Sequence, residues 1–266
     1  MFAQFHDRAE AGRLLAGKLS KYAGRPDVLV LALPRGGVPV GFEVARALQA
    51  PLDVMVVRKL GLPADEELAM GAIASGGWSV LNREVIDSYA IPRGLIESVA
   101  VREEHELERR ERAYRGRRTA PEVRGRVVIV VDDGIATGAT MRVAVAALRE
   151  AKAGRVVVAA PVAARESYLE LRCGATEVAV VILPKEFGGV GRFYTDFTQV
   201  TDADVSRLLA AARSQSTEDS AGSHRDQTAA SSASPLAASS ARRKSPTGAS
   251  QPNTSEAAAA ASRPML

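Results

Sequence analysis

The sequence predicts an α/β fold in which a parallel, twisted sheet is flanked by helices. Five short runs of mainly β-branched residues contain almost no polar side chains, as is typical of strands that are buried on both faces. Helical patterns separate several of these runs, and this alternation favours a doubly wound sheet, whose ligands bind at the carboxyl ends of the strands. The loops after the strands are therefore where a site is expected. The runs span residues 28–33, 52–57, 127–131, 155–160 and 177–183.

A helix is expected near the N-terminus, because Asp7 and Glu10 have the spacing of a capping box. Four apolar residues then recur at a spacing that puts them on one helical face, which should pack against the sheet or against a small accessory lobe. They are Ala11, Leu14, Leu15 and Leu19. Further helices are expected between the later strands, at residues 38–48, 140–152 and 165–172.

The interval from residue 61 to residue 125 is too long for a simple connection between two strands, so we expect it to carry an insertion. Within it, residues 102–118 place acidic and basic side chains at i,i+4 spacings that predict an exposed, salt-bridged helix. Glutamates interrupt the basic residues of this section, which favours a solvated face over a surface for nucleic acid.

The composition changes sharply near Ser214. The residues that follow are mostly Ser, Ala, Thr and Pro, and such a segment buries too little apolar surface to offset the entropy cost of ordering it. We therefore expect a folded domain at residues 1–213 and a disordered, low-complexity tail at residues 214–266.

Composition also limits the classes of partner. A net charge of +4 over 266 residues is too mild to indicate nucleic acid and is equally compatible with an anionic small molecule. Cys173 is the single cysteine, so the chain has no disulfide framework and no Cys-rich metal site, which favours a reducing compartment. The chain contains no run of about 18 uncharged apolar residues, so no membrane span is expected. These observations predict a cytoplasmic protein.

Two of the expected strands end in basic or glycine-rich sequences. Arg35, Gly36 and Gly37 follow the first run, where glycines let the backbone approach an anion closely and an arginine adds charge. A pyrophosphate-sized group fits this loop, and so does a tight turn that needs glycine for its dihedral angles. Arg58 and Lys59 follow the second run and indicate either a solvated strand end or a phosphate contact.

The third run is followed by two acids and a small loop that contains hydroxyl groups. Backbone N–H groups at the start of the helix expected there, with two threonine hydroxyls, can bind a phosphate monoester. Asp132 and Asp133 suit the vicinal hydroxyls of a sugar or a hydrated divalent cation, so the combination predicts a ribose that carries a 5-phosphate. An acidic turn that caps the helix is the alternative. The loop consists of Gly134, Ile135, Ala136, Thr137, Gly138, Ala139 and Thr140.

Residues 130–140, VVDDGIATGAT, resemble the phosphoribosyl pyrophosphate (PRPP) motif of type I phosphoribosyltransferases. The two basic loops occur in that family's order, and the resemblance covers about residues 25–200. It implies the type I phosphoribosyltransferase fold, with a small hood over the sheet. It also implies transfer of a 5-phosphoribosyl group from PRPP to a nitrogen acceptor, usually a nucleobase, with pyrophosphate leaving as its Mg2+ complex. Family members are often dimers, so a homodimer is compatible with this interpretation.

The resemblance further implies roles for individual residues. Asp132 and Asp133 would bind the ribose hydroxyls, and residues 134–140 would hold the 5-phosphate. Arg35 and Lys59 would act in catalysis, because with the two adjacent glycines they would stabilise the departing pyrophosphate. The predicted insertion corresponds to the position of a mobile loop that closes over the site in the family.

The acceptor is less well defined. Residues 184–191 are similar to a segment of purine-salvage members in which an aromatic ring stacks on the base and a following acid meets the metal, but the segment here is one residue longer. This similarity assigns Phe187 as a stacking platform, with ordinary packing as the alternative, and Asp196 as a metal ligand. Members that use 6-oxopurines have an aspartate where this chain has Ala136, so their general base is missing here. Trp78 is a second aromatic residue that could shape an acceptor site, with structural packing as the alternative.

A second class of function stays open at this point. A PRPP-sensing regulatory module with the same fold would bind the sugar without transferring it. Such modules usually carry an element that binds RNA or DNA, and the sequence shows neither a helix-turn-helix pattern nor a coherent basic face.

Overall fold

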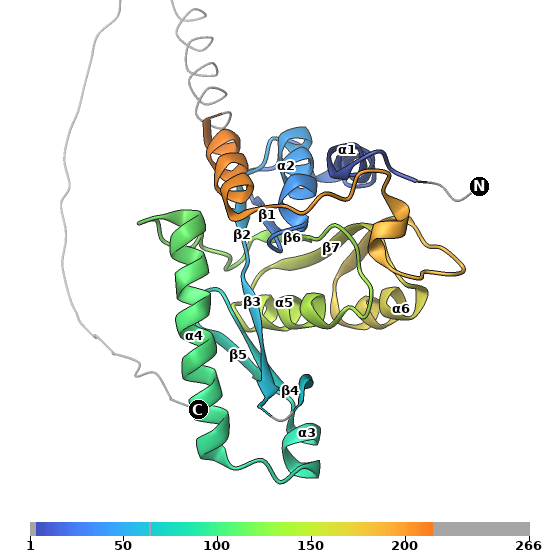
Figure 1. Cartoon of the computed structure of the whole chain (residues 1–266). Coiled ribbons are helices and arrows are strands. Elements are labelled where there is room, and N and C mark those ends of the chain that lie inside the picture. The colour runs from blue at the N-terminus through green and yellow to red at the C-terminus, as the bar shows by residue number, and fades with distance from the viewer. Residues whose placement is uncertain (1–3, 64, 215–266) are drawn as a thin grey trace, which may run out of the picture. The chain divides into compact units, whose positions relative to one another are not determined.

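A five-stranded parallel sheet forms the centre of the structure, which is a computed structural model that describes residues 4–63 and 65–214 (Figure 1). The strand order is β2-β1-β6-β7-β8, and every neighbouring pair is parallel. Every residue of the two central strands that carry the site, β1 and β6, is buried, as the continuous apolar runs predict. The strands are β1 (Val28–Ala32), β2 (Leu52–Val54), β6 (Val127–Val131), β7 (Arg155–Val162) and β8 (Glu177–Ile182).

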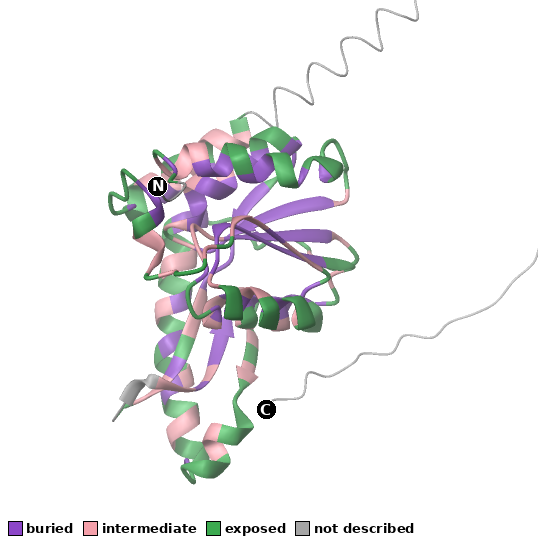
Figure 2. Cartoon of the chain, turned by 90° about the vertical axis from the view of Figure 1, so that its right-hand side faces the viewer, coloured by how far each residue is buried: buried purple, intermediate pink, exposed green. Residues whose placement is uncertain are grey.

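Helices cover both faces of this sheet, so that the buried strands lie between two helical layers (Figures 1 and 2). Alternate residues of β1 belong to different cores: Val30 packs with the helices on one side and Leu31 with the helices on the other. The α/β fold class is therefore confirmed. The covering helices are α1 (Arg8–Lys18) and α2 (Gly37–Leu48) on one face, and α5 (Ala139–Glu150) and α6 (Arg165–Gly174) on the other.

The N-terminal helix begins where the capping residues predict. The Asp7 side chain accepts a hydrogen bond from the Glu10 N–H at 2.7 Å, and the Glu10 carboxylate accepts one from the His6 N–H. Leu15 is fully buried, but the prediction for Leu14 was wrong, because its side chain is 50% exposed. The reason is that α1 packs against α2 through its small residues. A Cβ on Gly12 would lie only 2.8 Å from the Cβ of Glu43, so the buried face of α1 is the one that contains Ala11, Gly12, Leu15 and Ala16, and Leu14 lies to one side of it.

The second predicted strand is divided in the structure. β2 ends at Val54, and Val57 already belongs to a separate antiparallel sheet of order β3-β4-β5. Residues 57–115 form this sheet and two helices, and we call them the arm. Arg58 and Lys59 therefore lie within a strand of the arm, and not in a loop after the second strand as expected. The arm comprises β3 (Val57–Leu62), β4 (Asp65–Ala74), β5 (Trp78–Leu81), α3 (Arg83–Ser88) and α4 (Arg93–Arg115).

The arm accounts for most of the predicted insertion at residues 61–125, and its α4 contains most of the helix predicted at residues 102–118. The predicted tail lies outside the described residues from residue 215 onward. Among the helices that the structure describes, none is long and apolar enough to cross a membrane.

Residues from both ends of the domain form a small cover at one end of the sheet. The Phe5 N–H donates to the Phe193 carbonyl at 2.8 Å, and the Thr195 N–H donates to the Phe5 carbonyl at 2.9 Å. Phe5, Phe193 and Tyr194 bury their rings together against Val162 of β7. We call residues 4–7 and 187–200 the hood. It includes the 3-10 helix η2 (Val190–Phe193); a second one, η1 (Ser20–Tyr22), follows α1, and the described chain ends in a helix at residues 202–214.

Candidate functional site

The loops that follow β1 and β6 touch each other, because these two strands are neighbours in the sheet. A Cβ on Gly37 would lie 2.6 Å from the Val131 carbonyl oxygen, and a Cβ on Gly36 would lie 2.1 Å from a carboxylate oxygen of Asp133. Gly36 has ordinary right-handed dihedral angles, φ −61° and ψ −34°. Close approach of the two loops, and not an unusual backbone conformation, therefore requires glycine here.

Both loops present unpaired backbone donors. Among the residues that the structure describes, no protein atom accepts from the N–H groups of Arg35 and Gly36, or from those of Ala136, Thr137 and Gly138. The N–H groups of Arg35 and Gly36 lie just before α2, and those of residues 136–138 lie just before α5. Gly138 is the N-cap residue of α5 and has a left-handed backbone conformation, with φ +70°. Unpaired N–H groups ahead of helix N-termini attract anions. The arrangement places two loops with unpaired N–H donors at adjacent strand ends, and we call them the candidate anion-binding loops.

The loop before α5 is held in place from several sides. The Ile135 N–H donates to the Val162 carbonyl, and the Ile135 carbonyl accepts from the Ala164 N–H at 2.8 Å. The Ser167 hydroxyl donates to the Ala136 carbonyl at 2.5 Å, and Arg142 donates to the Thr137 carbonyl at 2.8 Å. The carbonyls are thus occupied while the N–H groups stay unpaired, so the loop is preorganised for an anion.

The two acids at the end of β6 differ in their surroundings. One oxygen of Asp132 accepts from the Asp133 N–H at 2.9 Å, and burial, with the adjacent Asp133 charge, raises the pKa of Asp132. The Asp133 carboxylate accepts from Arg8 Nε at 2.8 Å, with only 11% of the Arg8 side chain and 14% of the Asp133 side chain exposed. The Tyr194 hydroxyl donates to the Asp133 carbonyl at 2.6 Å, which ties the hood to the same residue.

An open pocket of about 340 Å³ lies between the loop that follows β1, Asp133, the start of α1 and the hood. Arg35 reaches its rim, where its guanidinium lies 3.8 Å from the Asp202 carboxylate. Asp202 also accepts from the Tyr114 hydroxyl at 2.7 Å, so the end of α4 and the start of the C-terminal helix meet beside Arg35. The lining includes Arg8, Arg35, Gly36, Asp133, Phe197 and Gln199.

The predicted site residues outside these loops lie elsewhere. Lys59 lines a separate pocket of about 410 Å³ on the arm, together with Arg58, whose guanidinium pairs with Glu103 at 2.5 Å. Phe187 is half-buried in the hood, with its ring centroid 5.8 Å from that of Phe193. Trp78 packs against the core on the α5 side of the sheet.

Asp196 lies on the exposed side of the hood. One of its oxygens accepts from both the N–H and the hydroxyl of Thr198, at 2.9 and 2.5 Å, and these bonds lower its pKa. No group of three or more His, Cys, Asp or Glu side chains within the described part of the chain could hold a metal ion. The assignment of Asp196 as a metal ligand thus stays a prediction from resemblance.

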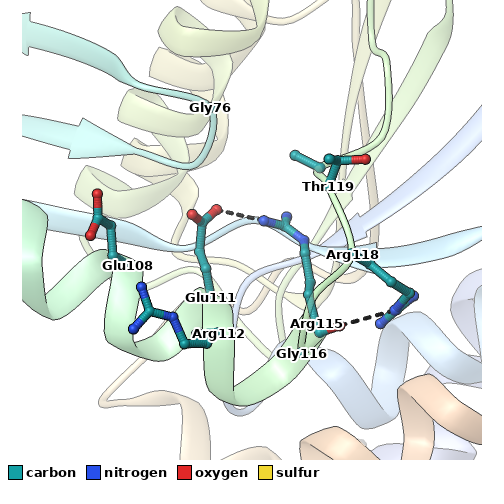
Figure 3. Close-up of a pocket in the computed structure, with 9 residues that line it drawn as sticks. Gly76, Glu108, Glu111, Arg112, Arg115, Gly116, Arg118 and Thr119 are labelled. Atoms are coloured by element: carbon teal, nitrogen blue, oxygen red, sulfur yellow. Dashed lines mark hydrogen bonds and ion pairs between the residues drawn. The ribbon is translucent and has the colours of Figure 1, made fainter.

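A further pocket, of about 280 Å³, lies where α4 joins the body of the protein (Figure 3). Figure 3 shows Glu111 pointing toward Arg115, and the two side chains pair at 2.5 Å. Arg115 also pairs with Asp53 of β2 at 2.9 Å and donates to the Val54 carbonyl. These contacts fasten α4 to the edge of the parallel sheet, so we interpret this pocket as part of a structural joint.

Sequence reasoning missed Arg8. It is a single arginine in the first turn of a helix, and no motif or periodicity distinguishes it. Its contact with Asp133 joins residues 125 positions apart, and only the packing of α1 beside the end of β6 reveals it.

Comparison with known proteins supports the resemblance to phosphoribosyltransferases over most of the chain. The family model described as "Phosphoribosyl transferase domain" matches residues 2–198. A Mycobacterium tuberculosis protein provisionally named as a phosphoribosyl transferase, Rv0571c, is 46% identical over 206 residues, which cover 77% of this chain and 46% of that protein. This chain therefore spans about half the length of the curated relatives that it matches.

A solved structure is also similar over most of its length. The crystal structure of TT1426 from Thermus thermophilus is 42% identical, covers 77% of this chain and 97% of that chain, and has a TM-score of 0.70. The predicted family and fold are thereby confirmed. On the strength of the family match and of the paired loops at the ends of β1 and β6, the chain belongs to the phosphoribosyl transferase domain family.

Proposed function

We propose that this protein transfers the 5-phosphoribosyl group of PRPP to a nitrogen acceptor, of nucleobase-like chemistry, and releases pyrophosphate. The observation that carries the proposal is the close approach of Gly36 and Gly37 to Asp132 and Asp133. The acids thereby lie beside one loop with unpaired N–H donors, at Arg35 and Gly36, and directly precede a second in the chain, at residues 136–138. PRPP has the matching groups: a pyrophosphate, a 5-phosphate and, between them, a ribose with two vicinal hydroxyls. Family membership supports the same donor.

The proposed roles follow from the chemistry of each group. Residues 134–140 bind the 5-phosphate through backbone N–H groups and the Thr137 and Thr140 hydroxyls, and Asp132 and Asp133 accept hydrogen bonds from the ribose hydroxyls. Arg35, with the Gly36 N–H, stabilises the charge that builds on the pyrophosphate as its bond to the ribose breaks. One such preorganised donor is worth about 3 kcal/mol.

The proposed roles of Lys59 and Phe187 each require something beyond the contacts that the structure contains. Lys59 lies on the arm, so it would reach the pyrophosphate only if β3 moved toward the site, which agrees with a closing loop at this position. Phe187 lies in the hood and already packs beside Phe193, so a base would have to use its remaining exposed surface. Arg35 is therefore the better supported of the two proposed catalytic residues.

Magnesium is proposed as a companion of the substrate. Mg2+ is commonly bound by one or two carboxylates together with substrate phosphates, and it retains several waters. The carboxylates of Asp132 and Asp133 beside the pyrophosphate loop fit such a site, without a cage of protein ligands. When bound, the ion would neutralise negative charge on the pyrophosphate.

The reaction is tested by following pyrophosphate release from PRPP and Mg2+ across a panel of nucleobases and related nitrogen acceptors. Release with one acceptor class is expected, and it names the substrate class at the same time. Calorimetric titration with PRPP alone is the companion measurement. Binding without release across the panel would indicate the PRPP-sensing alternative, and absence of binding would contradict both.

The predicted tail should not be required for binding. A protein that ends at residue 214 is expected to bind PRPP with the affinity of the full chain, because the residues of the proposed site all lie before it. Calorimetry on both proteins measures this, with thermal unfolding as the check that the shortened protein is folded. A loss of affinity beyond about threefold in a folded, shortened protein would show that the tail contributes to the site.

A further inference from the structure

We propose that Arg8 is a positioning residue for the ribose site, which orients the Asp133 carboxylate and links the hood to it. This inference rests on the proposed function, because it assigns Asp133 to a ribose hydroxyl. Its starting point is the 2.8 Å bond from Arg8 Nε to one carboxylate oxygen of Asp133, between two side chains that are only 11% and 14% exposed.

The Arg8 guanidinium is fixed on the hood side as well. Its Nη1 donates to the Thr198 carbonyl at 2.8 Å, and its central carbon lies 3.9 Å from the centroid of the Phe197 ring. A second hood residue, Tyr194, donates its hydroxyl to the Asp133 carbonyl at 2.6 Å. The backbone and the carboxylate of Asp133 are thus each held by a hood-linked contact.

The geometry leaves part of Asp133 available for a ligand. Arg8 occupies Oδ2, the oxygen that also faces Gly36, and no described residue donates to Oδ1. A fixed carboxylate with one occupied oxygen directs the other oxygen, a hydrogen-bond acceptor, toward a single donor position. This is the requirement for a residue that must meet one ribose hydroxyl.

Charge gives a second reason for an arginine at this place. Asp132 and Asp133 are adjacent acids in a partly buried site that is proposed to receive a polyanionic substrate, and Arg8 is a cation in direct contact with Asp133. Like charges disfavour each other strongly where water is scarce. The first turn of a helix favours acids and not bases, so the position of Arg8 in α1 brings no local benefit to the helix.

The test compares Arg8→Gln and Arg8→Lys with Arg13→Gln as the matched control. Arg13 lies on the same helix, is mostly exposed, and only approaches Glu43 at 3.9 Å. Each protein is titrated calorimetrically with PRPP and Mg2+, with ribose 5-phosphate, and with inorganic pyrophosphate and Mg2+. Thermal unfolding is measured in parallel.

Arg8→Gln is expected to weaken binding of PRPP and of ribose 5-phosphate roughly tenfold, the effect of losing one charge-assisted contact. Pyrophosphate binding should stay within about twofold, and Arg8→Lys should recover part of the loss because it keeps the charge without the planar fork. Arg13→Gln should behave as the wild type in all three titrations.

Four outcomes would overturn the inference. Equal PRPP affinity in wild type and Arg8→Gln would remove the positioning role and leave the proposed function intact. Equal losses for pyrophosphate and ribose 5-phosphate would show a general structural role. Should Arg8→Gln fail to fold, the same comparison is made with Arg8→Lys, in which unchanged ribose 5-phosphate affinity would also count against the proposal. A wild-type protein that binds no PRPP would overturn the proposed function itself, and this inference with it.

Discussion

Replacing both Asp132 and Asp133 with asparagine is expected to weaken PRPP binding by at least about tenfold. Two hydrogen bonds from the ribose hydroxyls would lose their charged acceptors, and each charge-assisted bond contributes about 1.5–3 kcal/mol. Calorimetric titration with PRPP and Mg2+ measures the change. Unchanged affinity would show that the ribose lies elsewhere.

Asp27→Asn is the control for this experiment. Asp27 is a partly exposed acid immediately before β1, at the opposite end of the strand from the site, where it pairs with Arg25 at 2.7 Å. The substitution removes a carboxylate without touching either candidate anion-binding loop, so the PRPP affinity of this variant should equal that of the wild type.

The single variant Asp132→Asn is expected to raise thermal stability although it lowers PRPP affinity. Burial and the Asp133 charge raise the pKa of Asp132 in the folded protein, so this carboxyl opposes folding as soon as the pH exceeds its ordinary pKa, which neutral pH does. Asparagine removes this cost, and the variant should unfold at a higher temperature than the wild type at neutral pH while it binds PRPP less tightly. A site that serves a ligand at the expense of stability behaves in this way.

Arg115→Ala is expected to destabilise the folded protein by about 3–5 kcal/mol, the usual effect of removing one member of a buried ion pair. Arg115 is the cation between Asp53 of β2 and Glu111 of α4, and its side chain is only 4% exposed. Its removal leaves the buried Asp53 carboxylate without its cation and the Val54 carbonyl without its donor. Urea unfolding of the two proteins gives the difference in free energy of unfolding.

Arg112→Ala provides the matched control, because Arg112 is an exposed arginine one turn earlier on α4. Its free energy of unfolding should stay within about 0.5 kcal/mol of the wild type. A double-mutant cycle with Asp53→Ala isolates the pair, and a coupling energy near zero would contradict the structural role given to this joint.

The sequence predicts those parts of the fold that depend on local pattern. The runs at β1 and β6 are apolar at every position because both faces of the sheet are covered, and the cap of α1 forms because Asp7 and Glu10 reach backbone N–H groups within one turn. The run at residues 52–57 shows where prediction from local pattern fails. It is almost as apolar, but Val54 still pairs with β1 whereas Val57 pairs with β4, and hydrophobicity carries no information about which strand is the partner.

The candidate site also has parts that local sequence predicts and parts that depend on tertiary contacts. The loops at residues 35–37 and 132–140 can be recognised singly, because glycines, acids and threonines have distinct chemistry at a strand end. Their contact depends on β1 and β6 being neighbours, which follows from the order of the sheet. Arg8 depends on both the sheet order and the packing of α1, and its local sequence resembles that of any exposed helix. Residues with a role set by tertiary contact alone are the ones that sequence patterns miss.

The pairing of the two ends of the domain in the hood has a consequence for synthesis. Phe5 pairs with residues 193–195, so these contacts join a part of the domain that leaves the ribosome first and a part that leaves it almost last. The central sheet can form once β8 has emerged, whereas Arg8 gains its contacts to Thr198 and Phe197 only afterwards. A nascent chain that stops before residue 193 would thus carry both candidate anion-binding loops on a complete sheet and lack the hood contacts. In the order of biogenesis, the two loops of the candidate site precede the contacts that fix Asp133.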